Sequence, residues 1–109
     1  MHTATASDAL TRFGYAVSDS TRARILLALR SGPGYPSELA DTFGVTRQLI
    51  SNHLACLRGC GLVVAVPEGR RTRYELADKR IAHALGDLVG LVLAVDPACC
   101  PSSEPQDCC

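Results

Sequence analysis

The sequence predicts a winged helix-turn-helix domain, mainly α-helical, with a two-stranded β-hairpin as its wing. Three observations carry this prediction. Two amphipathic segments of helical period meet at a tight turn at Gly44. Two extended segments then follow, joined by a loop that contains Gly69 and several arginines. The chain has 109 residues, enough for one domain, and a domain this small gains stability by forming a dimer.

The first three helices are predicted from apolar spacing and from residues typical of helix ends. Residues 8–17 form a short amphipathic segment. The second helix is expected to begin at Ser20 as its N-cap and to end at the glycine-proline-glycine turn of residues 32–34. The third begins near Pro36, which suits a first helical turn, and ends at Gly44. These three helices lead directly into the turn.

The fourth helix follows the turn, and Thr46 is its predicted N-cap. Ile50, Leu54 and Leu57 recur at helical spacing and should form its buried side. Gly61 supplies the turn out of the helix. In a helix-turn-helix unit, this second helix enters the major groove of DNA.

The wing and the last helix complete the predicted domain, which covers residues 1–95. Residues 62–66 and 72–76 read as strands, with "PEGRR" as the loop between them. Residues 78–95 form a long apolar helix. Residues 96–109 are rich in Cys, Pro and Ser, and are predicted to be a flexible tail.

Charge is balanced over the whole chain but not along it. Eleven basic residues meet eleven acidic ones. Residues 47–73 hold five arginines and one glutamate, a net of +4, whereas residues 75–109 hold six acids and two basic residues, a net of −4. Any contact with nucleic acid is therefore expected to be local and to involve the first of these segments.

The polar side of the fourth helix and the wing supply the candidate DNA contacts. Arg, Gln and Asn can form paired hydrogen bonds with base edges, while Ser, Thr and arginines suit phosphates. His53 lies about 60° from the apolar centre of the helix, so it is expected to be partly buried and hydrogen-bonded more than base-contacting. The candidate set is Thr46, Arg47, Gln48, Ser51, Asn52, His53, Arg70, Arg71 and Arg73.

Cysteines form the second candidate site. Cys56 and Cys60 lie one helical turn apart, so their Cβ atoms are expected to be about 5–6 Å from each other. Four more cysteines follow in the tail, and of these Cys99 and Cys100 stay nearest to the last helix. Thiolates select thiophilic ions such as Cd(II), Pb(II), Zn(II) and, by extension, As(III). Alternatively, Cys56 and Cys60 are small residues that fill the edge of the core.

Three segments resemble the ArsR/SmtB family of metal-responsive bacterial repressors. They are "DSTRARILLALRSG", "YPSELADTFGVTRQLISNHLACLRGCGLV" and "EGRRTRYELAD". Within the family, "NHLACLRGCGLVVAV" and "ALGDLVGLVLAVD" are most similar to the CmtR type, which senses cadmium and lead. The resemblance implies a homodimer that represses its own operon and leaves double-stranded operator DNA when the inducer binds. It also implies that a third ligand, here Cys99 or Cys100, is donated by the partner subunit from beyond the last helix.

Other functions leave weaker signals. The cysteines also fit an arsenite-responsive repressor, a repressor switched by disulfide formation, or a DNA-binding module with incidental thiols. Paired carboxylates, a nucleophile–base set and a phosphate loop are all missing, so an enzyme is not expected. Neither a signal peptide nor a membrane-spanning run is visible. The expected location is therefore the reducing cytoplasm, where six cysteines indicate metal or redox chemistry more than structural disulfides.

Overall fold

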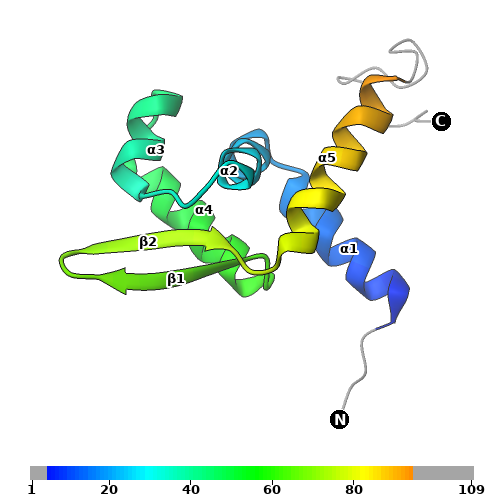
Figure 1. The fold of residues 1–109 in the computed structure, drawn as a ribbon, viewed down its shortest axis with the longest axis horizontal. Helices are drawn as coiled ribbons and strands as arrows, with labels where there is room; N and C mark the ends of the chain where they lie inside the picture. The colour runs from blue at the N-terminus through cyan, green and yellow to red at the C-terminus, as the bar shows by residue number, and fades with distance from the viewer. Residues whose placement is uncertain (1–4, 95–109) are drawn as a thin grey trace.

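A computed structural model describes residues 5–94 and confirms the winged helix-turn-helix (Figure 1). Five helices and one antiparallel hairpin make up this part of the chain. Their order is α1 (Ala6–Val17), α2 (Ser20–Arg30), α3 (Pro36–Phe43), α4 (Arg47–Gly59), β1 (Val63–Glu68), β2 (Arg71–Leu76) and α5 (Lys79–Leu93). The predicted tail, with Cys99, Cys100, Cys108 and Cys109, lies outside the described residues.

Helix starts follow the capping residues, with one correction. Ser20 is not the N-cap of α2, as the sequence predicted, but its first helical residue. Asp19 is the cap, because its carboxylate accepts hydrogen bonds from the backbone N–H groups of Thr21 and Arg22, at 2.9 and 3.1 Å. Thr46 caps α4 as predicted, and its hydroxyl accepts from the backbone N–H of Leu49.

The wing is longer than predicted. β1 continues through Pro67 to Glu68 and β2 begins at Arg71, so only Gly69 and Arg70 remain in the loop. Gly69 adopts a positive φ of 64°, which a tight hairpin loop favours. Pro67 has no N–H to donate to a neighbouring strand, so it is typical of a loop. Within residues 5–94, however, β1 pairs with β2 alone, and proline is tolerated on such an edge strand.

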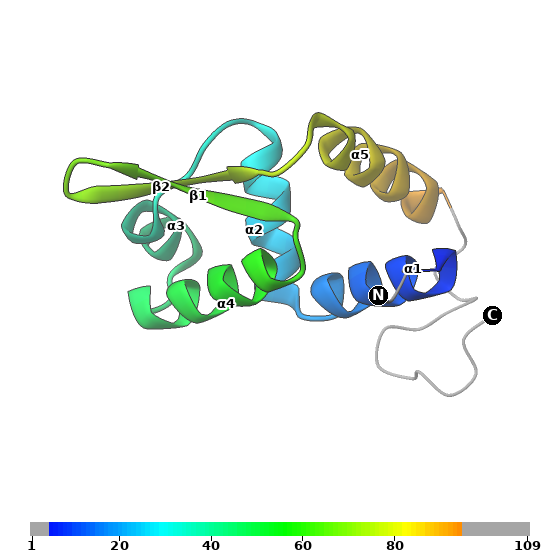
Figure 2. The same ribbon diagram turned by 90° about the horizontal axis from the view of Figure 1, so that it is seen from below.

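The core is centred on α2 and α4. Their largest fully buried side chains are Ile25, Leu26, Ile50, Leu54 and Leu57. The three apolar positions predicted for α4 are all in this set. Figures 1 and 2 show α2 inside the domain, with α3, α4 and the wing on one side of it and α1 and α5 at the opposite end.

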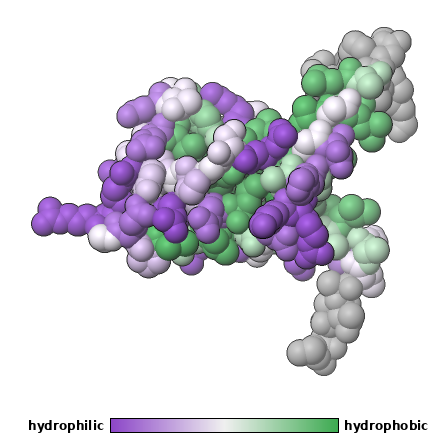
Figure 3. All heavy atoms as spheres, in the orientation of Figure 1, coloured by the Kyte–Doolittle hydropathy of each residue, from purple (hydrophilic) through white to green (hydrophobic). Residues whose placement is uncertain are grey.

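The helices α1 and α5 leave apolar side chains in solvent. Leu10 of α1 is 72% exposed, and Leu91, Val92 and Leu93 of α5 are 64%, 65% and 80% exposed. Figure 3 shows this apolar surface over α5, whereas polar residues cover the end that carries the wing. No helix within residues 5–94 is long and apolar enough to cross a membrane.

Candidate DNA-binding surface and thiol pair

The N-terminal half of α4 presents polar side chains to solvent. Arg47, Gln48 and Asn52 are exposed, and Ser51 is half-buried. The Gln48 amide donates a hydrogen bond to the Asn52 side-chain oxygen at 2.9 Å. This bond holds the two amides together on the exposed face of the helix. Four of the candidate DNA contacts on α4 thus share one surface.

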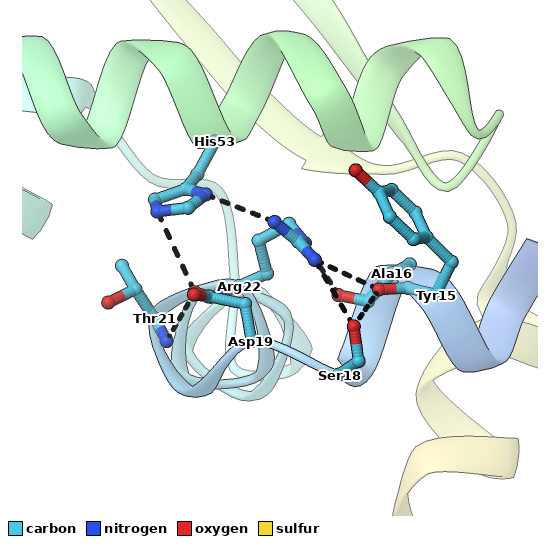
Figure 4. Close-up of polar contacts among 7 residues, drawn as sticks. All are labelled: Tyr15, Ala16, Ser18, Asp19, Thr21, Arg22 and His53. Carbon is cyan, nitrogen blue, oxygen red and sulfur yellow. Dashed lines mark hydrogen bonds and ion pairs between the residues drawn. The ribbon is translucent and has the colours of Figure 1, made fainter.

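His53 lies on a different side of α4, as its angular position predicted (Figure 4). Its Nδ1 is 3.5 Å from an Arg22 guanidinium nitrogen, and its Nε2 is 3.6 Å from an Asp19 carboxylate oxygen. Only 16% of the His53 side chain is exposed. Of the two roles considered for His53, this position favours a structural contact with α2 over a contact with DNA.

Arg22 is a structural residue that the sequence analysis missed. It is 8% exposed, and its guanidinium donates to the backbone oxygens of Ala16 and Tyr15, both at 2.9 Å. The guanidinium thereby joins the end of α1 to α2 and, through His53, to α4 (Figure 4). Its spacing could have indicated that Arg22 is buried. Arg22 precedes Ile25 by three residues and Leu26 by four, and it therefore lies on the apolar side of α2.

Asp19 is held in its ionised form at the same junction. The backbone hydrogen bond from Arg22 lowers the pKa of Asp19 most, and the His53 ring and the Arg22 charge lower it further. Partial burial opposes these effects. The carboxylate therefore remains a strong acceptor at the start of α2 at neutral pH.

The wing arginines differ in how they are engaged. Arg70 at the tip is exposed and makes no hydrogen bond or ion pair with any described residue. Arg71 donates to the Glu38 carboxylate at 2.6 Å, and its guanidinium carbon lies 3.5 Å from the centre of the Tyr35 ring. Arg73 donates to Glu68 at 2.8 Å. All three arginines were predicted as DNA contacts, and in the structure two of them have protein partners.

Tyr35 joins these contacts into one network. Its hydroxyl donates to the Glu68 carboxylate at 2.6 Å. This hydrogen bond raises the pKa of Tyr35 and, together with Arg73, lowers the pKa of Glu68. We call the five residues Tyr35, Glu38, Glu68, Arg71 and Arg73 the wing latch, because they connect the wing to the start of α3. Tyr35, Glu38 and Glu68 were not predicted, since a single sequence does not pair residues 33 positions apart.

A polar groove of about 240 Å³ separates the starts of α3 and α4 from the wing. Its basic and hydroxyl side chains come from all three elements. They are Tyr35, Ser37, Arg47, Ser51, Arg70, Arg71, Thr72 and Tyr74. Guanidinium and hydroxyl donors in this arrangement suit a phosphate group.

The thiol pair lies at the other end of α4. Cys56 and Cys60 are both free and half-buried, and Cys60 packs against the edge of the core. Burial raises the pKa of the Cys60 thiol, and the neighbouring Cys56 raises it further, against the lowering effect of Arg12 and Arg22. Two thiols this close repel one another as thiolates, so a soft cation between them would relieve that repulsion.

The pair does not form a complete metal site by itself. Among residues 5–94, no three His, Cys, Asp or Glu side chains are grouped so that they could hold a metal ion. The further ligands predicted, Cys99 and Cys100, lie outside that range. The donor set of Cys56 and Cys60 fits a soft ion in chemistry, but it needs at least one more ligand.

Comparisons with known proteins agree with this arrangement. Residues 19–64 match the family model described as bacterial regulatory protein, arsR family. The chain is 61% identical to the HTH-type transcriptional regulator CmtR of Mycobacterium tuberculosis (strain H37Rv) over 88 residues, which is 81% of this chain and 75% of that protein.

Two solved structures are similar as well. The NMR structure of the cadmium metal-sensor CMTR from Mycobacterium tuberculosis shares 60% identity, with a TM-score of 0.65 over 79% of this chain and 90% of that one. A homodimeric winged helix-turn-helix domain from Mycobacterium bovis shares 28% identity, with a TM-score of 0.72 over 85% of this chain and 90% of that one. On its sequence and its fold, the chain belongs to the ArsR family of bacterial transcriptional regulators.

Proposed function

We propose that the chain is a metal-responsive repressor. It binds double-stranded operator DNA as a homodimer and is released when Cd(II) or Pb(II) binds its cysteine thiolates. The observation that carries this proposal is that one helix, α4, bears both sites. Its first turns expose Arg47, Gln48 and Asn52. Its last turn carries Cys56, and Cys60 is its C-cap.

The DNA contacts are assigned to two regions. The exposed face of α4, with Arg47, Gln48, Ser51 and Asn52, enters the major groove and contacts base edges. Thr46 and the wing residues Arg70, Arg71 and Arg73 contact the flanking phosphates. His53 stays with Asp19 and Arg22, because its ring is already engaged there.

The inducer site is assigned to Cys56 and Cys60, together with Cys99 or Cys100 of the partner subunit. Three thiolates suit Pb(II) and As(III), whereas a fourth ligand favours Cd(II) or Zn(II). Cd(II) is placed first because the closely similar solved relative is described as a cadmium sensor. We assign the protein to the cytoplasm, where thiols stay reduced and are therefore available to bind a metal ion.

Dimerisation is assigned to α1 and α5. Phe13 and Val17 of α1 line an apolar groove of about 420 Å³ with Leu88, Val89 and Val92 of α5. An exposed apolar groove of this kind is typical of a subunit interface. A dimer would also set the spacing of the two α4 helices to about one turn of DNA, the spacing that successive major grooves require.

Metal binding would weaken DNA binding by tying the end of α4 to a segment beyond the dimerisation helix. A small rotation of the two α4 helices would then move them away from the positions at which they fit the two DNA half-sites. Coupling of this kind typically amounts to about 1–3 kcal/mol, and DNA must weaken metal binding by the same factor.

A release titration tests the proposal. A labelled duplex, selected from a randomised pool by the metal-free protein, is bound and then titrated with Cd(II), Pb(II), Zn(II) and As(III) by fluorescence anisotropy. Cys56→Ser and Cys60→Ser should bind the duplex like the wild type but should not release it, whereas the control Ala55→Ser should behave normally. Truncation after Pro97 should have the effect of the cysteine variants. Normal release from either cysteine variant would contradict the site.

The same anisotropy assay separates the alternatives when an oxidant is added as a further titrant and ultraviolet absorption is recorded. Release by As(III) alone favours the arsenite-responsive repressor. Release by an oxidant, without metal-thiolate ultraviolet absorption under reducing conditions, favours the disulfide switch.

A further inference from the structure

Arg71 has two competing uses at the same place in the structure. It lines the polar groove between α3, α4 and the wing, and it is also ion-paired with Glu38 at 2.6 Å. Glu38 belongs to the first turn of α3, directly after Ser37, which lines the same groove. The groove that suits a phosphate therefore has a carboxylate of the protein bound to one of its three arginines.

The groove itself has the chemistry of a DNA phosphate site. Arg47 of α4 lines it, as do Arg70 and Arg71 of the wing. The same groove is lined by Ser37 and Ser51. Arginines bind phosphate oxygens through paired, charge-assisted hydrogen bonds. Glu38 and Arg71 are 63% and 50% exposed in their side chains, so the ion pair is open to exchange with an anion from solution.

We propose that Glu38 competes with the DNA backbone for Arg71, so that the protein's own carboxylate occupies part of the phosphate site until DNA displaces it. This inference rests on the proposed DNA-binding function and adds that Glu38 limits the affinity of the protein for DNA. If a phosphate instead takes the remaining donors of Arg71, it lies beside the Glu38 carboxylate and is repelled by it. In both cases Glu38 weakens the contact.

Tyr35 keeps Arg71 in position during this exchange. The Arg71 guanidinium stacks on the Tyr35 ring, and Tyr35 is in turn fixed by its hydrogen bond to Glu68. Stacking on a ring leaves the edge of the guanidinium available for an anion. The loss of Glu38 should therefore leave Arg71 near the groove and ready to bind phosphate.

The substitution Glu38→Gln tests the competition, since it keeps the shape of the side chain and removes its charge. We expect each subunit to contribute about a two- to fivefold gain in DNA affinity, the range typical of one exposed ion pair, so that the gain for the dimer is about four- to twenty-five-fold. The gain should be equal for the selected duplex and for an unrelated one, because a phosphate contact carries no sequence information. The plot of log affinity against log salt should become steeper by up to about 1.8, the contribution of two further neutralised phosphates, one for each subunit of the dimer.

Asp41→Asn is the matched control. Asp41 is exposed on the same helix, and its side chain has no ion pair or hydrogen bond within residues 5–94, but the variant changes the net charge by the same amount. The second control is Arg71→Ala, alone and combined with Glu38→Gln. In the Arg71→Ala background, Glu38→Gln should have no more effect than Asp41→Asn. Melting temperatures should show that all variants fold.

Two outcomes would overturn the inference. One is an equal gain from Glu38→Gln and Asp41→Asn, which would indicate long-range charge alone. The other is a gain from Glu38→Gln that persists without Arg71. If the wild-type protein binds neither duplex, the proposed function fails instead, so the two failures are distinguishable.

Discussion

Asp19 shows how one side chain serves two elements. Its carboxylate caps α2 through two backbone N–H groups and also faces the His53 ring of α4. The pKa of Asp19 is lowered mainly by the backbone hydrogen bond from Arg22. A carboxyl with a lowered pKa in the folded state adds stability above its unfolded pKa, here 3.8, and this stability is lost as the pH falls through the folded value.

The substitution Asp19→Asn separates the cap from the charge. Asn is as good an N-cap as Asp, so α2 should keep its capping hydrogen bonds. We expect a slightly lower melting temperature at about pH 7 and a smaller fall in melting temperature down to about pH 3 than in the wild type. Circular dichroism melts over this pH range measure both. If the melting temperature of Asp19→Asn falls with pH as much as those of the wild type and of Asp41→Asn, the Asp19 charge has no role in acid stability.

At the scale of elements, the segment between α2 and α3 acts as a small extension of the sheet. The backbone of Gly34 pairs with Tyr74 of β2 through two hydrogen bonds of 2.8 Å. A Cβ atom at Gly34 would lie 2.9 Å from Leu29 Cδ2 and 3.4 Å from Leu39 Cδ1, both in the buried core. An alanine at position 34 would therefore force the Leu29 side chain to shift within the core.

We accordingly expect Gly34→Ala to destabilise the domain by about 1–3 kcal/mol, the usual cost of overpacking a core. Gly59→Ala is the matched control, because Gly59 is helical and a Cβ there would contact nothing within 4 Å. Its free energy of unfolding should stay equal or rise by up to about 1 kcal/mol, since Ala favours a helix. Urea denaturation compares the two. Equal stability in both variants would mean that Leu29 and Leu39 move aside without cost.

The elements themselves could be predicted from the sequence because each has a local signal. The apolar period of α4 and its cap at Thr46 depend on neighbouring residues only, and the structure confirms both. The wing latch could not be predicted, because Arg71 and Glu38 are separated by 33 positions and an exposed arginine has no local preference for one partner. Ser20 was predicted as a cap in place of Asp19 because both residue types favour that position.

At the scale of the whole molecule, the proposed DNA surface and the proposed dimer interface lie at opposite ends. The wing and the start of α4 form one end, and α1 and α5, whose apolar residues line the groove, form the other (Figures 1 and 2). The thiol pair occupies the end of α4 that leads toward α1, where Arg12 of α1 influences the Cys60 pKa. A ligand at the thiols is thus placed between the proposed dimer interface and the proposed DNA surface.

The proposed dimer interface can be tested by introducing one charged side chain among the exposed apolar residues of α5. Val92 is 65% exposed and lines the apolar groove, so Val92→Asp should place an unpaired carboxylate in the interface. A two-fold dimer contains the substitution twice, and we expect the dimer dissociation constant to rise by at least about a hundredfold. Sedimentation velocity should then show a monomer. DNA affinity should fall as well, because one subunit contacts only one half-site.

Val64→Asp is the control for this substitution. Val64 is 40% exposed, lies in β1 and does not line the apolar groove, so the same apolar-to-acid change there should leave the dimer intact. Since α1 and α5 carry the apolar groove, a dimer that survives Val92→Asp would move the interface away from them. The two α4 helices would then sit at a different spacing, and the coupling between thiols and DNA would need another path.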